Sequence, residues 1–231
     1  MKKNARYRGH IRSKVLAYNP KACQICGYDK VVEVVHIKPR HKGGRDVPDN
    51  VVLLCPNHHK EYDRGKMSKK ELLKRIKRYI EGVKLKRTDV YFDERGKLIE
   101  ILRCDDALFK EFGQIYVSTI AHNAIKAWHS HKQQTDNIFC VKGNIKLVLY
   151  DNRKYSRSKG VINELFLGES NPLLVQIPPG VWHGWKGISD ENQESTVINI
   201  SDIPYNYFQP DEFRLDPYNN EIPYDWRRKD G

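Results

Sequence analysis

Two short pairs of potential metal ligands stand near the start of the 231-residue chain. Cys23-x-x-Cys26 and Cys55-x-x-His58 are separated by twenty-eight residues. A tetrahedral zinc ion takes four ligands of this kind, delivered as two tight pairs. The pattern predicts a structural zinc site that helps to fold a segment too small to build its own core. Ordinary buried cysteines are the alternative.

The second half of the chain contains histidines that could act together, two of them spaced as on one face of a β-strand. His129 and His131 are separated by one residue, and His183 follows the turn Pro178-Pro179-Gly180. Residues two apart on a strand point to the same face of a sheet, so the first two histidines can act together. An imidazole that titrates near neutral pH can take a proton and return it, which suits acid–base chemistry on adjacent carbons.

The elements that must position these groups change in character along the chain. Short β-branched runs at residues 31–37 and 51–54 predict a hairpin followed by a helix. The capping sequence Ser68-Lys69-Lys70-Glu71 precedes apolar residues at helical spacing and predicts another helix. After Thr88, many short strand-like runs separated by turns favour an all-β sandwich or barrel. We therefore expect an α+β chain of two domains, divided into a basic arm, a small zinc-stapled module, a basic linker helix and a β barrel: residues 1–22, 23–66, 67–87 and 88–231.

The basic residues are concentrated in the N-terminal part. Residues 1–87 contain 24 Lys and Arg against 8 Asp and Glu, whereas residues 88–231 contain 17 against 21. DNA is therefore an expected partner of the N-terminal part alone, and a solvated lysine-rich surface is the alternative.

Neither a membrane partner nor a secreted location is expected. No run reaches the eighteen or so apolar residues of a membrane span, and no signal peptide is evident. The cysteines are five, an odd number, and three of them have metal-ligand spacing rather than that of a disulfide framework. We expect a cytoplasmic protein with reduced thiols.

The residues from Cys23 to Gly65 resemble the HNH endonucleases. The resemblance is carried by Glu33 to Pro39, Gly43-Gly44, Asp49 to Cys55 and His59 to Gly65. It implies a small ββα-metal fold that binds one divalent ion near the scissile phosphate.

On that pattern His36 is the general base that activates water, and Asn50 orients it. His59 and Asp63 are ligands of a divalent ion, Mg2+ or Mn2+, which neutralises charge developing on the phosphate. Val35 stands where many members of the family carry another metal ligand. A DNA-binding or purely structural module is therefore the alternative to a nuclease.

The second half of the chain resembles the dTDP-4-dehydrorhamnose 3,5-epimerase family of cupins. Five stretches occur in the family's order: Phe112 to Ser118, Lys126 to Lys132, Leu149 to Arg153, Ile177 to Gly184 and Asp216-Pro217. The resemblance implies an all-β cupin, or jelly-roll, barrel that needs no cofactor, pairs as a homodimer and acts on a sugar nucleotide such as a dTDP-4-keto-6-deoxy sugar.

On that pattern His129 is the base that removes the proton beside the 4-keto group, and Asp216 orients it. His183 lines the same cavity and can stabilise the enolate oxygen. His131 is a second catalytic candidate, because sugar-nucleotide 3,4-ketoisomerases carry a similar His-x-His-Lys stretch. The other expected substrate-binding residues are Lys126, Arg153 and Trp182.

Two features of the sequence leave alternative functions of the barrel open. The proton-donating tyrosine of the family falls near Ile198, where no side chain can donate a proton, and this favours a one-sided reaction or binding alone. The spacing of His129, His131, Asp136 and His183 also approaches the general metal-cupin pattern, which would hold a transition metal.

The sequence thus predicts an NDP-4-keto-6-deoxy-sugar epimerase or isomerase fused to an HNH-type DNA-binding or nuclease module. The alternative is an HNH endonuclease whose cupin is a sugar-nucleotide-binding or metal-binding sensor without epimerase activity.

Overall fold

The computed structural model describes residues 22–45, 50–76 and 78–227. Its chain divides into two compact units, Met1–Tyr79 and Ile80–Gly231. The predicted basic arm lies almost entirely outside the described residues. Where the chain is described, no helix combines the length and the apolarity that a bilayer crossing requires.

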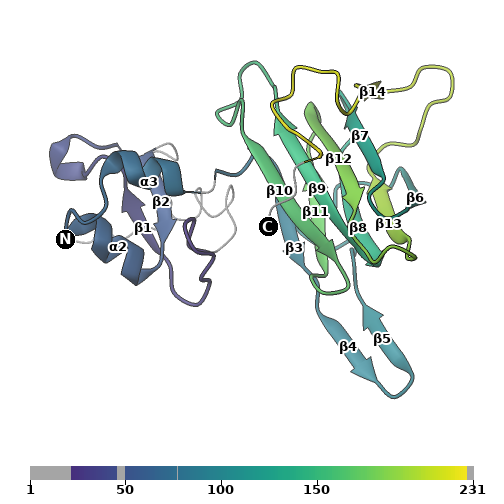
Figure 1. The fold of residues 1–231 in the computed structure, drawn as a ribbon, viewed down its shortest axis with the longest axis horizontal. Coiled ribbons are helices and arrows are strands. Elements are labelled where there is room, and N and C mark those ends of the chain that lie inside the picture. The colour runs from purple at the N-terminus through teal and green to yellow at the C-terminus, as the bar shows by residue number, and fades with distance from the viewer. Residues whose placement is uncertain (1–21, 46–49, 77, 228–231) are drawn as a thin grey trace. The chain divides into compact units, whose positions relative to one another are not determined.

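The first unit contains the predicted ββα arrangement (Figure 1). Its elements are strand β1 (Glu33–His36), the 3-10 turn η1 (Arg40–Lys42), strand β2 (Val51–Leu54), helix α2 (Pro56–Asp63) and helix α3 (Lys69–Arg75). The two strands pair antiparallel, with Val35 opposite Val52. These two side chains are buried together with Leu54, Met67 and Leu72. The small core therefore joins the hairpin to both helices.

Helix α3 begins as the capping sequence predicts but ends much earlier than expected. The Ser68 hydroxyl accepts a hydrogen bond from the Glu71 amide, and the Glu71 carboxylate accepts one from the Ser68 amide. The helix stops at Arg75, and Lys84–Arg87 forms strand β3. The prediction of a linker helix over residues 67–87 is therefore wrong beyond Arg75, because β-sheet pairing overrides helical periodicity there.

The second unit is a jelly-roll barrel of two five-stranded antiparallel sheets (Figure 1). One sheet has the strand order β10-β9-β12-β7-β14, and the other has the order β3-β11-β8-β13-β6. The strands are β3 (Lys84–Arg87), β6 (Gln114–Ile120), β7 (Ile125–Ser130), β8 (Asp136–Lys142), β9 (Asn144–Asp151), β10 (Ile162–Gly168), β11 (Leu173–Ile177), β12 (Val181–Gly187), β13 (Ser195–Ser201) and β14 (Phe213–Arg214). A separate hairpin of β4 (Val90–Asp93) and β5 (Gly96–Ile99) extends beyond the barrel.

Strand β3 moves the start of the barrel to the N-terminal side of the predicted boundary at residue 88. It pairs with β11, with Leu85 opposite Val175. Ile80 and Val83, just before the strand, are buried in the core between the two sheets. The second unit therefore begins at Ile80.

The alternation of side chains along the strands separates two apolar layers. Leu147 and Leu149 of β9 lie in the core between the sheets. Val148, one residue away, belongs to a second cluster that contains Trp128, Trp182, Ile222 and Trp226. Neighbouring residues of a strand point to opposite faces. The C-terminal segment thus covers the outer face of one sheet, and the inner face is left for the site.

Candidate active site and metal centre

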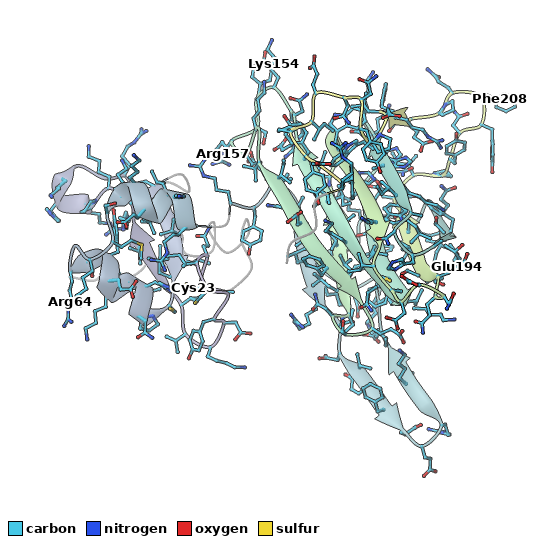
Figure 2. All side chains as sticks on the ribbon, in the orientation of Figure 1. Cys23, Arg64, Lys154, Arg157, Glu194 and Phe208 are labelled. Atoms are coloured by element: carbon cyan, nitrogen blue, oxygen red, sulfur yellow. The ribbon has the colours of Figure 1, made fainter. Side chains whose placement is uncertain are left out.

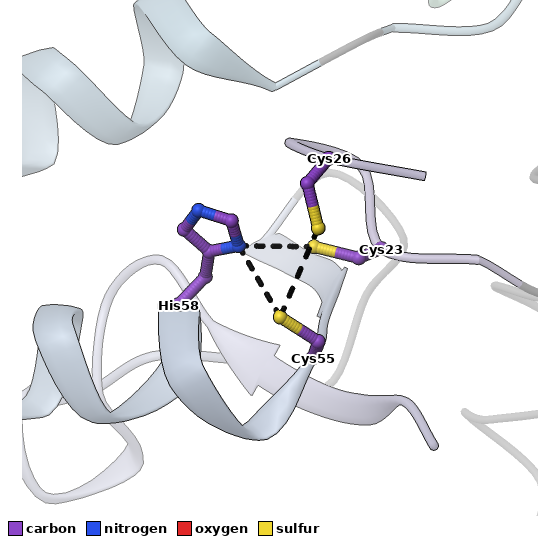
Figure 3. A group of neighbouring side chains, drawn as sticks. All are labelled: Cys23, Cys26, Cys55 and His58. Atoms are coloured by element: carbon purple, nitrogen blue, oxygen red, sulfur yellow. Dashed lines mark hydrogen bonds between the residues drawn. The ribbon is translucent and has the colours of Figure 1, made fainter. Parts of the chain in front are cut away.

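Four side chains of the first unit converge as a metal site (Figure 3). The ligand atoms of Cys23, Cys26, Cys55 and His58 all lie within 4.8 Å of one another. The Nδ1 atom of His58 is 3.5 Å from the Cys23 sulfur and 3.3 Å from the Cys55 sulfur, and the sulfurs of Cys26 and Cys55 are 3.9 Å apart. A tetrahedron with zinc bond lengths of about 2.0–2.3 Å places its ligands about 3.5–3.8 Å apart. The four residues therefore fit one structural ion.

Local structure prepares this cluster for a cation. Cys55 is the N-cap of α2 and Pro56 follows at the first turn, which brings His58 back toward the sulfurs. Burial raises the pKa of the Cys23 thiol, but hydrogen bonds from backbone amides, chiefly those of Cys26 and Cys55, outweigh it and lower the pKa to about 6. The thiolate is the form that binds metals, so the predicted ligands form a structural metal site.

A groove of about 790 Å³ in the first unit brings the predicted nuclease residues together. His36, His59 and Asp63 line it, and four cationic side chains line it with them: Lys38, Arg40, Lys42 and Lys69. An open groove with this charge suits the phosphates of a nucleic acid.

Glu33 is a carboxylate beside the predicted HNH residues that was not identified from the sequence. Its carboxylate lies 2.5 Å from Nδ1 of His59, whose Nε2 lies 3.1 Å from the Asp63 carboxylate. Val35 is buried in the core and offers no ligand. Glu33 stands two residues before Val35 on β1. Residues two apart on a strand share a face, and this spacing could have identified Glu33 from the sequence. The contacts of His59 with the two carboxylates join the three side chains as ion pairs, and the role of His59 and Asp63 as ligands of Mg2+ or Mn2+ stays a prediction.

The Asn50 side chain forms hydrogen bonds with the backbone that follows His36. Its side-chain oxygen accepts a hydrogen bond from the Lys38 amide at 2.8 Å, and its nitrogen donates to the carbonyls of Lys38 and Arg45. Asn50 thus fixes the backbone two residues beyond His36, and its direct role as the orienter of that imidazole stays a prediction.

In the barrel, two sheets contribute opposite sides of one polar cluster. His129 of β7 and His183 of β12 come from one sheet and lie opposite each other in register. Asp136 comes from β8 in the other sheet. His131, just after β7, joins them, since its ring centroid is 5.9 Å from that of His183. The predicted histidines are therefore neighbours in space.

The carboxylate beside His129 is Glu212, and the prediction of Asp216 in this role is wrong. Oε1 of Glu212 lies 3.0 Å from Nδ1 of His129. The Asp216 carboxylate is exposed and accepts hydrogen bonds from the amides of Tyr218 and Asn219. The extent of strand β14 explains the difference. Arg214, the last residue of the strand, pairs with His129, and Glu212 just before the strand contacts that imidazole. Asp216 follows the strand and caps the turn at Tyr218 and Asn219.

Burial and charge set the protonation of this pair in opposite directions. Burial lowers the pKa of His129, and the Glu212 carboxylate only partly opposes this. Burial raises the pKa of Glu212, but hydrogen bonds from Arg214 and His129 outweigh it, and the pKa is lowered overall. At neutral pH the pair is a neutral imidazole beside a carboxylate, which is the state of a general base.

His131, His183 and Asp136 form a second, more deeply buried group. Nε2 of His131 and Nε2 of His183 lie 3.4 Å and 3.5 Å from the same Asp136 oxygen. Their Nδ1 atoms face the backbone carbonyls of Asp211 and Val181. If both imidazoles are neutral, each carries its proton on Nδ1, which donates to a backbone carbonyl. Each Nε2 is then a hydrogen-bond acceptor that faces the Asp136 carboxylate, which is also an acceptor. This arrangement fits a shared proton or a bound cation.

The inward residue of β13 beside this group is Asn199, whereas Ile198 points to the opposite face of the strand. Asn199 is buried, and its side-chain nitrogen lies 2.7 Å from Oδ1 of Asp136 and 2.9 Å from the hydroxyl of Tyr116 on β6. Neither Asn199 nor Tyr116 was identified from the sequence. Only the pairing of Tyr116 with Asn199 across β6 and β13 reveals them.

The three other predicted substrate-binding residues have different surroundings. The Lys126 ammonium donates to the Ser118 hydroxyl at 2.8 Å, two residues from Tyr116 on β6. The Arg153 guanidinium donates to the Asp151 carboxylate and to the Glu81 carbonyl, which indicates a structural role. The ring of Trp182 packs in the outer apolar cluster.

Trp182 is therefore misassigned, because adjacent strand residues face opposite sides and His183 takes the inner one. Trp185 is an aromatic residue at the site, and its ring stacks on that of His129 with centroids 6.2 Å apart.

Comparison with known proteins agrees with this two-part organisation. The family model described as dTDP-4-dehydrorhamnose 3,5-epimerase matches residues 77–230, and the model described as HNH endonuclease matches residues 23–68.

The relatives match through the barrel. The spore coat polysaccharide biosynthesis protein SpsL of Bacillus subtilis is 38% identical over 148 residues, which is 64% of this chain and 96% of the relative. The protein named "Probable low-salt glycan biosynthesis epimerase Agl13" of Haloferax volcanii is 36% identical over 148 residues, which is 63% of this chain and 89% of the relative. The crystal structure of a dTDP sugar isomerase from Desulfovibrio desulfuricans G20 has a TM-score of 0.61 at 32% identity and covers 65% of this chain and 94% of that chain. Through its barrel the chain belongs to the dTDP-4-dehydrorhamnose 3,5-epimerase family, as an epimerase- or isomerase-like enzyme that carries an HNH-type module at its N-terminal end.

Proposed function

We propose that the barrel epimerises or isomerises an NDP-4-keto-6-deoxy sugar by removing a proton from a carbon next to the keto group. The observation that carries this proposal is the pair of His129 and Glu212. Glu212 holds Nδ1, and among the described residues Nε2 of His129 has no hydrogen-bond partner. The side chain of His129 is 23% exposed, so a substrate can reach it.

The expected chemistry is general base catalysis. Nε2 of His129 takes the proton, and the electron pair of the broken C–H bond moves into an enolate whose charge rests on the former keto oxygen. Lys126, which reaches the inner face of β6, supplies a cation for that oxygen. His183 suits this role less well, because Nε2 has no proton in the tautomer that Val181 selects.

Solvent deuterium exchange tests the barrel directly. We expect dTDP-4-keto-6-deoxyglucose in D2O to gain deuterium with the protein and to gain none with His129→Ala, as followed by mass spectrometry and proton NMR. His122→Ala is the matched control, because His122 lies on the loop between β6 and β7 and contacts the Ser189 carbonyl. Absence of uptake with the unaltered protein would leave the barrel as a binding module.

We infer that the barrel pairs as a homodimer. Strand β6 is the edge of its sheet and exposes Ile115 and Val117. The β4–β5 hairpin exposes Phe92, and Figure 2 shows Phe208 directed away from the barrel on the loop before β14. Sedimentation velocity should give twice the mass of the chain, and Val117→Glu should lower it to that of one chain.

For the first unit we propose DNA binding and metal-dependent strand cleavage with His36 as base. The groove that joins His36, His59 and Asp63 to four cationic side chains supports this. Plasmid nicking with Mg2+ or Mn2+ should disappear in His36→Ala while DNA binding is retained. Equal nicking by that variant would remove His36 from the mechanism, and loss of DNA binding would point to a structural role instead.

We propose zinc as the ion of the cysteine cluster, because three sulfurs and one imidazole nitrogen are the ligands of structural zinc. Elemental analysis should give one zinc per chain, which Cys26→Ser should remove. Cys104→Ser is the matched control, since Cys104 is an exposed cysteine outside the cluster.

A transition metal in the barrel is a second candidate, favoured by the facing acceptors of His131, Asp136 and His183. In that case the protein should hold a second ion per chain, and Asp136→Asn should release it while the zinc stays. His129 is turned toward Glu212 and does not belong to this group.

A further inference from the structure

The barrel needs a proton donor to invert a carbon, and the family position predicted near Ile198 does not provide one. The inward neighbour is Asn199, an amide that cannot supply a proton at neutral pH. Its side-chain nitrogen instead holds the hydroxyl of Tyr116, 2.9 Å away on the neighbouring strand. The phenol of Tyr116 therefore lies beside Asn199, near the position where the sequence shows no proton donor.

The contacts of Tyr116 leave its proton available. The Asn199 amide uses the phenolic oxygen as an acceptor, and among the described residues the O–H of Tyr116 donates to no group. Tyr116 is 41% exposed, so the hydroxyl can meet a ligand. Partial removal of the side chain from water raises the pKa of Tyr116, while the Asn199 hydrogen bond partly opposes this and the charge of Asp136 adds to it. The phenol therefore stays protonated at neutral pH.

Tyr116 and His129 come from different sheets. Strand β6 closes one sheet, and β7 lies in the other. Tyr116 shares a face with the buried Asn199, which contacts Asp136, and Asp136 contacts His183 opposite His129. Tyr116 and His129 thus belong to the two sheets on either side of one polar cluster, an arrangement that would present an imidazole and a phenol to opposite faces of a sugar ring placed there.

We propose that Tyr116 is the catalytic acid that protonates the enolate on the face opposite His129, and that Asn199 is its positioning residue. This proposal rests on the proposed function of the barrel and specifies its outcome as inversion at carbon.

The proton balance of the step is complete without a co-reactant. His129 takes a proton from one face of the carbon, and the C–H electron pair forms the enolate. The enolate then re-forms the carbonyl as the carbon takes the proton of Tyr116 from the other face, which forms a new C–H bond and leaves a phenolate. The Asn199 N–H stabilises that phenolate. Exchange with water returns a proton to Tyr116 and removes one from His129.

The same geometry distinguishes two reaction classes. In a 3,4-ketoisomerisation one group can carry the proton between adjacent carbons on a single face, and Tyr116 is not needed. In an epimerisation the proton leaves from one face and returns to the other, so both sheets must contribute. The position of Tyr116 favours epimerisation.

Tyr116→Phe separates the two half-reactions with dTDP-4-keto-6-deoxyglucose in D2O. We expect the variant to keep deuterium uptake into unepimerised substrate, because His129 can return a deuteron to the face from which it took the proton. Formation of the inverted sugar should fall about 100-fold or more, a typical contribution of a general acid. Tyr155→Phe, on an exposed tyrosine of the loop after β9, should match the unaltered protein in both measurements.

Asn199→Ala gives an independent readout of positioning. It should slow inversion less than Tyr116→Phe does and shift the alkaline limb of the inversion rate to higher pH, because the phenolate loses its N–H donor. Inversion at the normal rate by Tyr116→Phe would overturn the proposal while leaving His129 chemistry intact. Loss of uptake together with inversion, in a variant that melts normally, would also overturn it. Absence of uptake by the unaltered protein would instead remove the proposed function on which it rests.

Discussion

At the scale of single residues, the Glu212 carboxylate determines which nitrogen of His129 is left unpaired within the described part of the chain. An imidazole alone can turn either nitrogen toward a substrate, but the Glu212 oxygen at 3.0 Å holds Nδ1 and leaves Nε2 to act. Arg214 in turn lies 2.9 Å from the other Glu212 oxygen. The orientation of the proposed base therefore depends on three residues, one from β7 and two from the segment that forms β14.

A pair of substitutions tests which carboxylate serves the base. Glu212→Gln keeps the shape of the side chain but removes its charge. Deuterium uptake should fall, by at most the roughly 100- to 10,000-fold that general base catalysis contributes. Asp216→Asn is the matched control and should stay within about 3-fold of the unaltered protein, since that carboxylate caps an exposed turn. The reverse ranking would restore Asp216 as the partner.

The pH dependence follows from the same environment. Burial lowers the pKa of His129 below its ordinary value of 6.5. The base form accumulates as pH rises through that pKa, so kcat/KM for uptake should rise from acid pH and level off near neutrality, with its inflection below 6.5. In Glu212→Gln the inflection should move to still lower pH, because the group that raises the pKa of His129 is lost. An inflection above 6.5 in the unaltered protein would contradict the burial argument.

At the scale of elements, the segment after α3 belongs to the barrel. Ile80 is fully buried and Val83 is 8% exposed, and both lie in the core between the sheets. The Ile80 and Glu81 amides donate to side chains of Asn163 and Ser158. Strand β3 then adds the edge of one sheet. The barrel therefore needs residues that look like part of a basic helix in the sequence.

Two fragments test this boundary. A fragment of residues 78–231 should fold and keep deuterium uptake, because it retains β3 and the two buried side chains. A fragment of residues 88–231 should lose at least about 3 kcal/mol of unfolding free energy, since burial of each such side chain contributes roughly 1.5–3 kcal/mol. Urea denaturation followed by tryptophan fluorescence measures the difference. Equal midpoints would place the boundary at residue 88.

At the scale of the whole molecule, the two units carry different charge and different chemistry. Residues 1–79 hold 21 of the 41 Lys and Arg, and the groove of the first unit is lined by cations. A salt-dependent interaction with a polyanion is therefore expected from one unit, whereas ligand binding by the barrel is expected to depend on a few buried polar groups.

Charge removal in each unit tests this division. Log Kd for duplex DNA should depend on log salt concentration with a slope near 0.9 for each phosphate contacted. Arg40→Gln with Lys42→Gln, in the groove, should reduce that slope by about 2. Lys154→Gln with Lys159→Gln, on the barrel, is the matched control and should leave it unchanged. Equal effects of the two pairs would indicate a general surface charge rather than a groove.

The sequence by itself determined the features that depend on nearby residues or on their order. The spacing of Cys23, Cys26, Cys55 and His58 was enough to identify the metal site, because each pair is delivered by one tight turn. The capping box at Ser68 located the start of α3 for the same reason. The ordered motifs of the second half were enough for the jelly-roll fold, and the role of His129 stays a prediction.

Only the tertiary structure decided which side chains meet across the sheets. Glu212 and Asp216 flank strand β14, and Glu212 contacts His129 whereas Asp216 caps the turn after the strand. Asn199 rather than Ile198 faces inward, and Tyr116 reaches it because β6 pairs with β13. The contacts of Glu212 with His129 and of Tyr116 with Asn199 each join residues that are 83 positions apart. The pairing of Tyr116 with Asn199 depends on strand register, which is set by the packing of the whole barrel, and a one-residue change in register would turn one of these two side chains to the opposite face.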